Sequence, residues 1–127
     1  MINLGHQGFT ELKVWQKARE LKIEIHNLTL TFPAEEKYRL SNQLIRSSRS
    51  VTSNIAEGHG RLTYKDQLHF CIQARGSLSE TYNHLCDAFD CKYMGEETFL
   101  LFQKKISEVT LLLNGYMKYL KQKIGSK

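Results

Sequence analysis

The last third of the chain carries the most regular pattern in the sequence, with apolar residues at alternating spacings of three and four. They are Phe99, Phe102, Ile106, Val109, Leu113, Tyr116 and Leu120. This spacing places all of them on one face of a long helix, like the seam of a coiled coil. The pattern predicts a helix that packs against other helices over most of its length.

Further apolar residues of this segment lie outside the seam, namely Leu100, Leu111, Leu112 and Met117. They predict that the helix buries a second face. A helix on the outside of a domain that buries two faces needs a neighbour on its outer side. The sequence therefore predicts a homo-oligomer.

Three earlier segments show the same helical periodicity. Their apolar stripes are Val14, Ala18, Leu21, Ile25 and Leu28, then Leu44, Ser48, Val51 and Ile55, then Phe70, Ala74, Leu78, Leu85 and Phe89. The period-2 alternation of β-strands is absent. We expect one all-α domain, 1–127, folded as an antiparallel up-down-up-down four-helix bundle. The expected helices are 10–31, 34–58, 63–93 and 96–124.

Local residues indicate where these helices begin and end. Thr10 is the expected N-cap of the first helix, with Phe9 packing back onto its first turn. Pro33 is expected to open the second helix, because proline suits the first helical position. Thr63 and Asp66 have the spacing of a capping-box variant at the start of the third helix. Glycines are the expected stops of the second and third helices, namely Gly58, Gly60 and Gly95.

Composition narrows the class of protein. The chain has no apolar run of about 18 residues, so we expect no membrane span. Its first residues, MINLGHQGFTELK, lack the charged and apolar regions of a signal peptide. The three cysteines, Cys71, Cys86 and Cys91, are an odd number without a disulfide framework. We therefore expect reduced thiols and a cytoplasmic location.

Motifs for catalysis and metal binding are missing from the sequence. It contains no P-loop, no GxSxG and no HExxH, and it lacks the paired ExxH motifs of di-iron bundles. Cys86 and Cys91 are five residues apart, so the two thiols do not share a helix face. We expect no enzymatic activity, no metal and no cofactor.

The charge of the chain is positive and uneven. The formal net charge is +5, with a pI of about 9.2. Residues 37–79 carry seven Lys and Arg against two Asp and Glu, and residues 98–127 carry six against one. Residues 80–97, between them, carry one against five. Two basic regions separated by an acidic one favour a polyanionic partner, RNA or DNA, although a solvated surface would have the same composition.

The stretch QLIRSSRSVTSNIAEGHGR, residues 43–61, combines small and charged residues in one helix. Ser47, Ser50, Ser53 and Ala56 would let another helix approach closely. Asn54 and Glu57 share a helix face because they are three residues apart. With Arg61 and Glu80 they form either a polar network that fixes helix register, which we favour, or a ligand contact.

Candidate functional residues follow from these patterns. The candidates for phosphate contact are Arg46, Arg49, Arg61, Lys65, Arg75, Lys118, Lys121 and Lys123. The candidate structural motif is Asn54, Glu57, Gly58, Ser77 and Glu80. We expect aromatic residues not to be interleaved with these basic positions as a base-stacking platform would need. We therefore expect binding that is directed at the nucleic-acid backbone, sensitive to salt and weakly specific for sequence.

Three segments resemble a known family, the four-helix-bundle proteins encoded in intervening sequences of bacterial 23S ribosomal RNA genes. The segments are FTELKVWQKARELKIEI, FPAEEKYRLSNQLIRSSRSVTSNIAEGHGR and FCIQARGSLSE, within residues 9–85. The SNIAEGxGR and ARGSLxE patterns are specific to the family. Thr52 is a departure, because the family commonly has proline there, and it predicts a straighter second helix.

The resemblance implies a ring-shaped assembly, a homopentamer. It also implies that Arg46, Asn54, Glu57, Arg61, Ser77 and Glu80 shape the bundle and the subunit contacts. The family is similar to the accessory variability protein of diversity-generating retroelements, which binds nucleic acid and partners a reverse transcriptase. Two main interpretations follow. The first is a non-enzymatic oligomeric nucleic-acid-binding protein, and the second is an adaptor for a reverse transcriptase or another protein. A third, an enzyme with a site between subunits, has no motif in its support.

Overall fold

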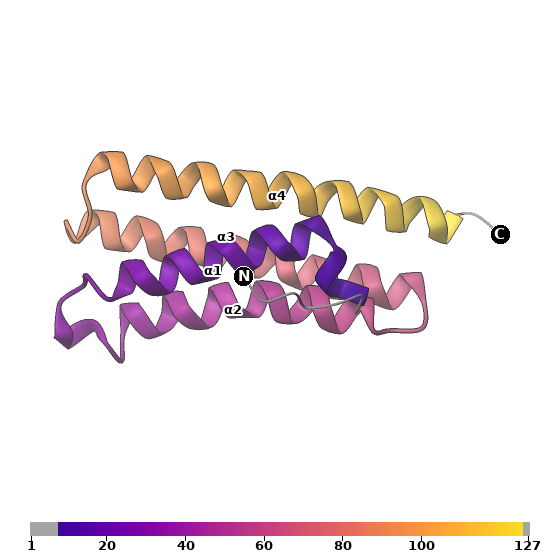
Figure 1. Ribbon diagram of the computed structural model, residues 1–127, viewed down its shortest axis with the longest axis horizontal. Coiled ribbons are helices and arrows are strands. Elements are labelled where there is room, and N and C mark those ends of the chain that lie inside the picture. Colours follow the sequence, from indigo (N-terminus) through magenta and orange to yellow (C-terminus); the bar gives the residue numbers. More distant parts are fainter. Residues whose placement is uncertain (1–7, 126–127) are drawn as a thin grey trace.

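Four α-helices run back and forth along one axis in the computed structural model, which describes residues 8–125 (Figure 1). They are α1 (Lys13–Thr29), α2 (Leu40–His59), α3 (Tyr64–Asp90) and α4 (Glu96–Gly125). Two short 3-10 helices, η1 (Gly8–Glu11) and η2 (Ala34–Glu36), precede α1 and α2. The predicted domain, 1–127, extends beyond the described residues at both ends. The segment in which no signal peptide was expected, residues 1–13, begins before the first described residue.

The helices pack in the order of the sequence, and α1 also packs against α4 to close the bundle. This arrangement confirms the expected all-α up-down bundle. The four helices differ in length, with 17 residues in α1 and 30 in α4. As Figure 1 shows, α4 therefore extends past the beginning of α1. No helix within residues 8–125 combines the length and the apolar character needed to cross a bilayer.

The apolar stripes of the four helices meet in one core. Its fully buried side chains include Leu21, Ile25, Leu44, Ile55, Leu78, Leu85, Leu113 and Leu120. Complete burial of a side chain of this size stabilises the folded state by about 1.5–3 kcal/mol. The helical periodicity of the sequence therefore identified the residues that hold the bundle together.

The predicted second apolar face of α4 is divided in the structure. Met117 is buried in the core, because it follows Leu113 by one helical turn. Leu112 is half-buried. Leu100 and Leu111 face outward, with 50% and 74% of their surface exposed. The exposed part of this face therefore consists of leucines that the single chain does not cover.

The start of α1 differs from the prediction. The helix begins at Lys13, and the residue before it, Leu12, makes no side-chain cap. Thr10 lies instead in η1, where its backbone carbonyl accepts a hydrogen bond from Gln16 Nε2 at 2.9 Å. Phe9 packs edge-on against Trp15 at 5.2 Å between ring centroids, as expected for a residue that folds back onto the first turn.

The second helix begins at Leu40, six residues after the predicted start. Glu36 explains the delay, because its carboxylate accepts hydrogen bonds from two directions. One donor is the Leu40 backbone N–H at 3.4 Å, and the other is the Tyr93 hydroxyl at 2.6 Å. The acidic residue thus lies at the positive end of the α2 dipole, as expected, but from the turn before the helix. The bond to Glu36 raises the pKa of Tyr93 to about 12, so the hydroxyl remains a donor.

The ends of α3 show one prediction confirmed and one corrected. Thr63 caps the helix, since its hydroxyl accepts from the Asp66 backbone N–H at 3.1 Å. At the other end α3 stops at Asp90, before the expected residue 93. Lys92 adopts a left-handed conformation there, with φ of 63°. The Tyr93 N–H donates to the Ala88 carbonyl at 2.9 Å, which closes a Schellman motif.

Lys92 occupies the position that glycine favours, so Lys92→Gly should stabilise the protein. A residue with a Cβ pays about 1–2 kcal/mol in this conformation, partly offset by the greater freedom of glycine in the unfolded chain. We expect a gain of about 1 kcal/mol, measured by urea unfolding. Lys92→Ala is the matched control, because it removes the same charge and keeps the Cβ. Equal effects of the two substitutions would contradict the conformational explanation.

Candidate nucleic-acid interface

Helices α2 and α3 approach each other through pairs of small polar residues. The Thr81 hydroxyl donates to Ser47 Oγ at 2.8 Å, and both residues are buried. Further along the same interface, the hydroxyls of Ser50 and Ser77 lie 2.9 Å apart. Buried hydroxyl groups must be hydrogen-bonded to avoid a desolvation cost, so these pairs specify how α2 and α3 align.

Gly58 lies at the end of this interface, where the two helices approach closely. A Cβ at this position would lie 2.7 Å from Phe70 Cβ and 3.1 Å from the Gln67 carbonyl oxygen. Neither of these atoms is the end of a flexible side chain. Gly58 was expected as a helix stop and as part of the structural motif, but α2 continues to His59. Its role is therefore to let α3 approach.

The four small residues predicted to form a close-packing face do not all lie on it. Ser47 and Ser50 face α3, whereas Ser53 is exposed and Ala56 is half-buried. The reason is helical geometry. Three residues turn the helix by about 300°, so Ser53 points about 60° away from the direction of Ser50, and Ala56 points further away still. Asn54 supports Ser50 from within α2, with its amide donating to the Ser50 carbonyl at 2.9 Å and to Ser50 Oγ at 3.1 Å.

The other polar residues of the motif form separate pairs. Glu57 binds Arg61 one turn later, with 3.2 Å between Oε1 and Nη2, and both side chains are about half exposed. Glu80 approaches Nε2 of His84 at 3.3 Å. The predicted single network of Asn54, Glu57, Arg61 and Glu80 therefore does not form. Ser77 joins α3 to Ser50 of α2, Asn54 bonds Ser50 within α2, and Glu57 and Glu80 remain at the surface.

We expect Gly58→Ala to destabilise the protein by about 1–3 kcal/mol, because the added methyl group must push α3 away. The measurement is urea unfolding followed by circular dichroism. Gly76→Ala is the control, because Gly76 lies inside α3 with open space around it. Alanine there should stabilise by up to about 1 kcal/mol. If both substitutions stabilised the protein, the close approach at Gly58 would not limit packing.

All eight basic residues predicted to contact phosphate are exposed, namely Arg46, Arg49, Arg61, Lys65, Arg75, Lys118, Lys121 and Lys123. Arg61 is held by Glu57 and also lies over the Phe70 ring, 4.7 Å from its centroid. The other seven form no ion pair with any residue within 8–125. Most of the predicted set is therefore available to an anionic partner.

These basic residues do not form one surface. Arg61 and Lys65 lie where α2 ends and α3 begins, at the same end of the bundle as the C-terminal lysines of α4 (Figure 1). Arg46 and Arg49 lie in the first half of α2, and Arg75 lies nearer the middle of α3. Most of the predicted basic residues therefore form one group at an end of the bundle, and the remaining three lie separately along its sides.

Two cations near Arg49, namely Arg19 and Lys22, were not among the residues predicted from the sequence. Burial lowers the pKa of Lys22 on α1, and the charges of Arg19 and Arg49 lower it further. Three positive groups from two helices therefore lie close together. Residues 1–36 gave no signal because their net charge is −1. A helical projection could have found the pair, because Arg19 and Lys22 are three residues apart on one flank of α1.

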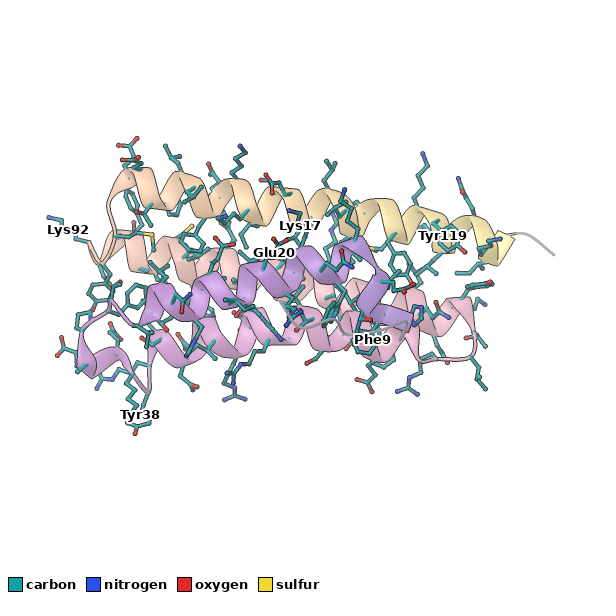
Figure 2. The ribbon with its side chains drawn as sticks, in the orientation of Figure 1. Phe9, Lys17, Glu20, Tyr38, Lys92 and Tyr119 are labelled. Atoms are coloured by element: carbon teal, nitrogen blue, oxygen red, sulfur yellow. The ribbon has the colours of Figure 1, made fainter. Side chains whose placement is uncertain are left out.

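The opposite flank of α1, next to α4, carries compensated charge. Glu24 binds Lys105 of α4 at 2.7 Å, and Lys17 pairs with Glu20 at 3.4 Å. Figure 2 shows Lys17 and Glu20 beside α4, where they line a small cavity of about 50 Å³. Among the described residues, Arg19 and Lys22 on the flank of α1 nearer α2 form no ion pair.

Charge is also separated along the bundle axis. We call the segments 8–17, 54–72 and 113–125 the basic end, since they carry seven Lys and Arg against three Asp and Glu. We call the segments 27–43 and 85–101 the acidic end, where the numbers are three and six. The net charges are +4 and −3, so a polyanion would be attracted to one end and repelled by the other.

The family assignment rests on a profile match together with this fold. The profile described as 23S rRNA-intervening sequence protein matches residues 10–115. The chain belongs to this family. A structure from Bacteroides thetaiotaomicron, described as a protein with unknown function from the S23 ribosomal protein family, is similar. The two share 25% sequence identity with a TM-score of 0.76, over 83% of this chain and 95% of that one. No curated protein matches.

Proposed function

We propose that this protein of the 23S rRNA-intervening sequence family is a non-enzymatic, oligomeric nucleic-acid-binding protein that contacts the RNA or DNA backbone through basic surfaces. The observation that supports the proposal is the set of seven exposed cations without an ion-pair partner among the described residues. Exposed cations of this kind exchange their counterions for phosphate groups, which drives binding.

The exposed apolar surface supports the oligomer. Leu100 and Leu111 on α4 and Ile72 on α3 are each at least half exposed. Burying them against another subunit would stabilise an assembly by about 25 cal/mol per Å² of apolar area. The assembly we propose is the ring-shaped homopentamer that the family resemblance implies. A ring would also multiply the positive charge presented to one nucleic-acid molecule.

The charge reversal Arg49→Glu/Lys65→Glu should greatly weaken RNA binding, by about tenfold or more at low salt. Each lost phosphate contact should also reduce the slope of log K against log salt by about 0.9. The measurement is electrophoretic mobility of structured RNA and duplex DNA in a salt series, with the mass of the protein determined by light scattering.

Lys37→Glu/Lys92→Glu is the matched control. It changes the net charge of the chain by the same amount, but both lysines lie at the acidic end. It should leave RNA binding nearly unchanged. Equal losses in the two variants would show that only net charge matters, and unchanged binding of the Arg49/Lys65 variant at low salt would contradict the assigned surface.

The alternative is an adaptor for a reverse transcriptase or another protein. One feature favours it, an open groove beside α3 and α4 lined by Tyr82, Leu100, Gln103, Lys104, Ile106 and Ser107. An oligomer that bound neither RNA nor DNA even at low salt would support this alternative, and the groove would be the first surface to test for a protein partner.

A further inference from the structure

The basic end holds aromatic side chains that are direct neighbours of basic residues in the sequence, Tyr64 before Lys65 and Tyr119 after Lys118. Tyr64 at the start of α3 is 43% exposed, and Tyr119 near the end of α4 is 47% exposed. They lie at the end of the bundle that also carries Lys65, Lys121 and Lys123. The expectation that aromatic and basic residues stay apart is therefore wrong at this end of the molecule.

Tyr119 belongs to a stacked group on α4. Its ring lies nearly parallel to that of Tyr116, with 6.2 Å between centroids and 13° between planes. Lys123 Nζ lies 5.7 Å from the centroid of the Tyr119 ring. Burial raises the pKa of Tyr116 to about 12, so its ring is neutral at physiological pH. Tyr119 thus has a supported, partly exposed ring with a lysine beside it.

The first helix does not reach the level of this ring. Leu21 of α1 and Val109 of α4 lie at the same level, since they line one cavity between the two helices. Tyr119 is ten residues beyond Val109, or about 15 Å further along the axis. The antiparallel position on the other helix is residue 11, which precedes the start of α1 at Lys13. Beside Tyr119 the first helix has therefore ended.

The acidic end provides an internal comparison. Tyr38 is 82% exposed, and Lys37 Nζ lies 5.4 Å from the centroid of its ring, so it forms the same kind of pair as Tyr119 and Lys123. Figure 2 shows Tyr38 and Tyr119 toward opposite ends of the bundle. The net charge differs, −3 at the acidic end and +4 at the basic end. Only the basic end combines an exposed ring with attraction for phosphate.

We propose that the basic end binds single-stranded nucleic acid, with a base stacked on Tyr119 and the adjoining phosphates contacted by Lys118 and Lys123. The proposal rests on the proposed function and specifies its partner more closely, as single-stranded rather than double-stranded nucleic acid. A base has its faces free only when it is unpaired and unstacked, so the ring selects single strands over duplexes. When a base covers the ring, Lys123 is released from it and can reach a phosphate.

The test is fluorescence anisotropy with labelled, unstructured oligonucleotides of RNA and of DNA, and with duplexes of the same length. Tyr119→Leu removes the ring and keeps an apolar side chain suited to a helix. We expect it to weaken single-strand binding by about 5- to 100-fold, the effect of losing one stacked base. Duplex binding should change little, because it depends on the lysines.

Two further variants separate stacking from other causes. Tyr38→Leu makes the same substitution at the acidic end and should leave binding unchanged. Tyr119→Trp keeps an aromatic ring and should preserve single-strand binding, which a general disturbance of α4 would not. Thermal unfolding of each variant checks that the bundle is intact.

The outcomes distinguish this proposal from the proposed function. If Tyr119→Leu left single-strand binding unchanged while the Arg49/Lys65 reversal weakened it, stacking at Tyr119 would be overturned and backbone binding would stand. Equal losses on single strands and duplexes would also overturn it. If the unaltered protein bound none of these nucleic acids at low salt, the proposed function itself would fail.

Discussion

The close approach of α2 and α3 is the constraint on which the rest of the structure depends. Gly58 admits the Phe70 side chain, and the buried pair of Ser47 and Thr81 sets the alignment of the two helices at the other end of the contact. Because a hydroxyl buried without a partner is costly, a shift by one residue would be strongly disfavoured. The same contact brings Arg61 over Phe70, so packing also positions part of the basic end.

The unequal lengths of the helices determine which side chains are exposed at the ends of the bundle. With 17 residues, α1 is much shorter than α4, which has 30, and it begins only after the level of Tyr119. The antiparallel order then places the start of α3 beside the end of α4, whose three lysines carry most of the positive charge of the basic end. A bundle with these lengths therefore has two chemically different ends, even though its core is continuous.

The basic surfaces are of two kinds. The basic end joins lysines with exposed aromatic rings, and the α1–α2 flank joins Arg19, Lys22 and Arg49 without an acidic partner within residues 8–125. On the other flank of α1, Glu24 and Lys105 neutralise each other. A polyanion that follows the positive side of one subunit and continues onto the next is consistent with the ring that we propose.

The sequence by itself determined the helices, the core and the cap at Thr63, because periodicity and capping depend on residues three or four apart. It also placed most cations outside, since charged side chains are rarely buried. Only the tertiary structure decided the start of α2, where Glu36 meets Tyr93 from 57 positions away. It likewise decided the positive cluster around Lys22, where Arg49 of α2 lies close to α1. These features join residues distant in the chain, and their geometry exists only after the helices have packed.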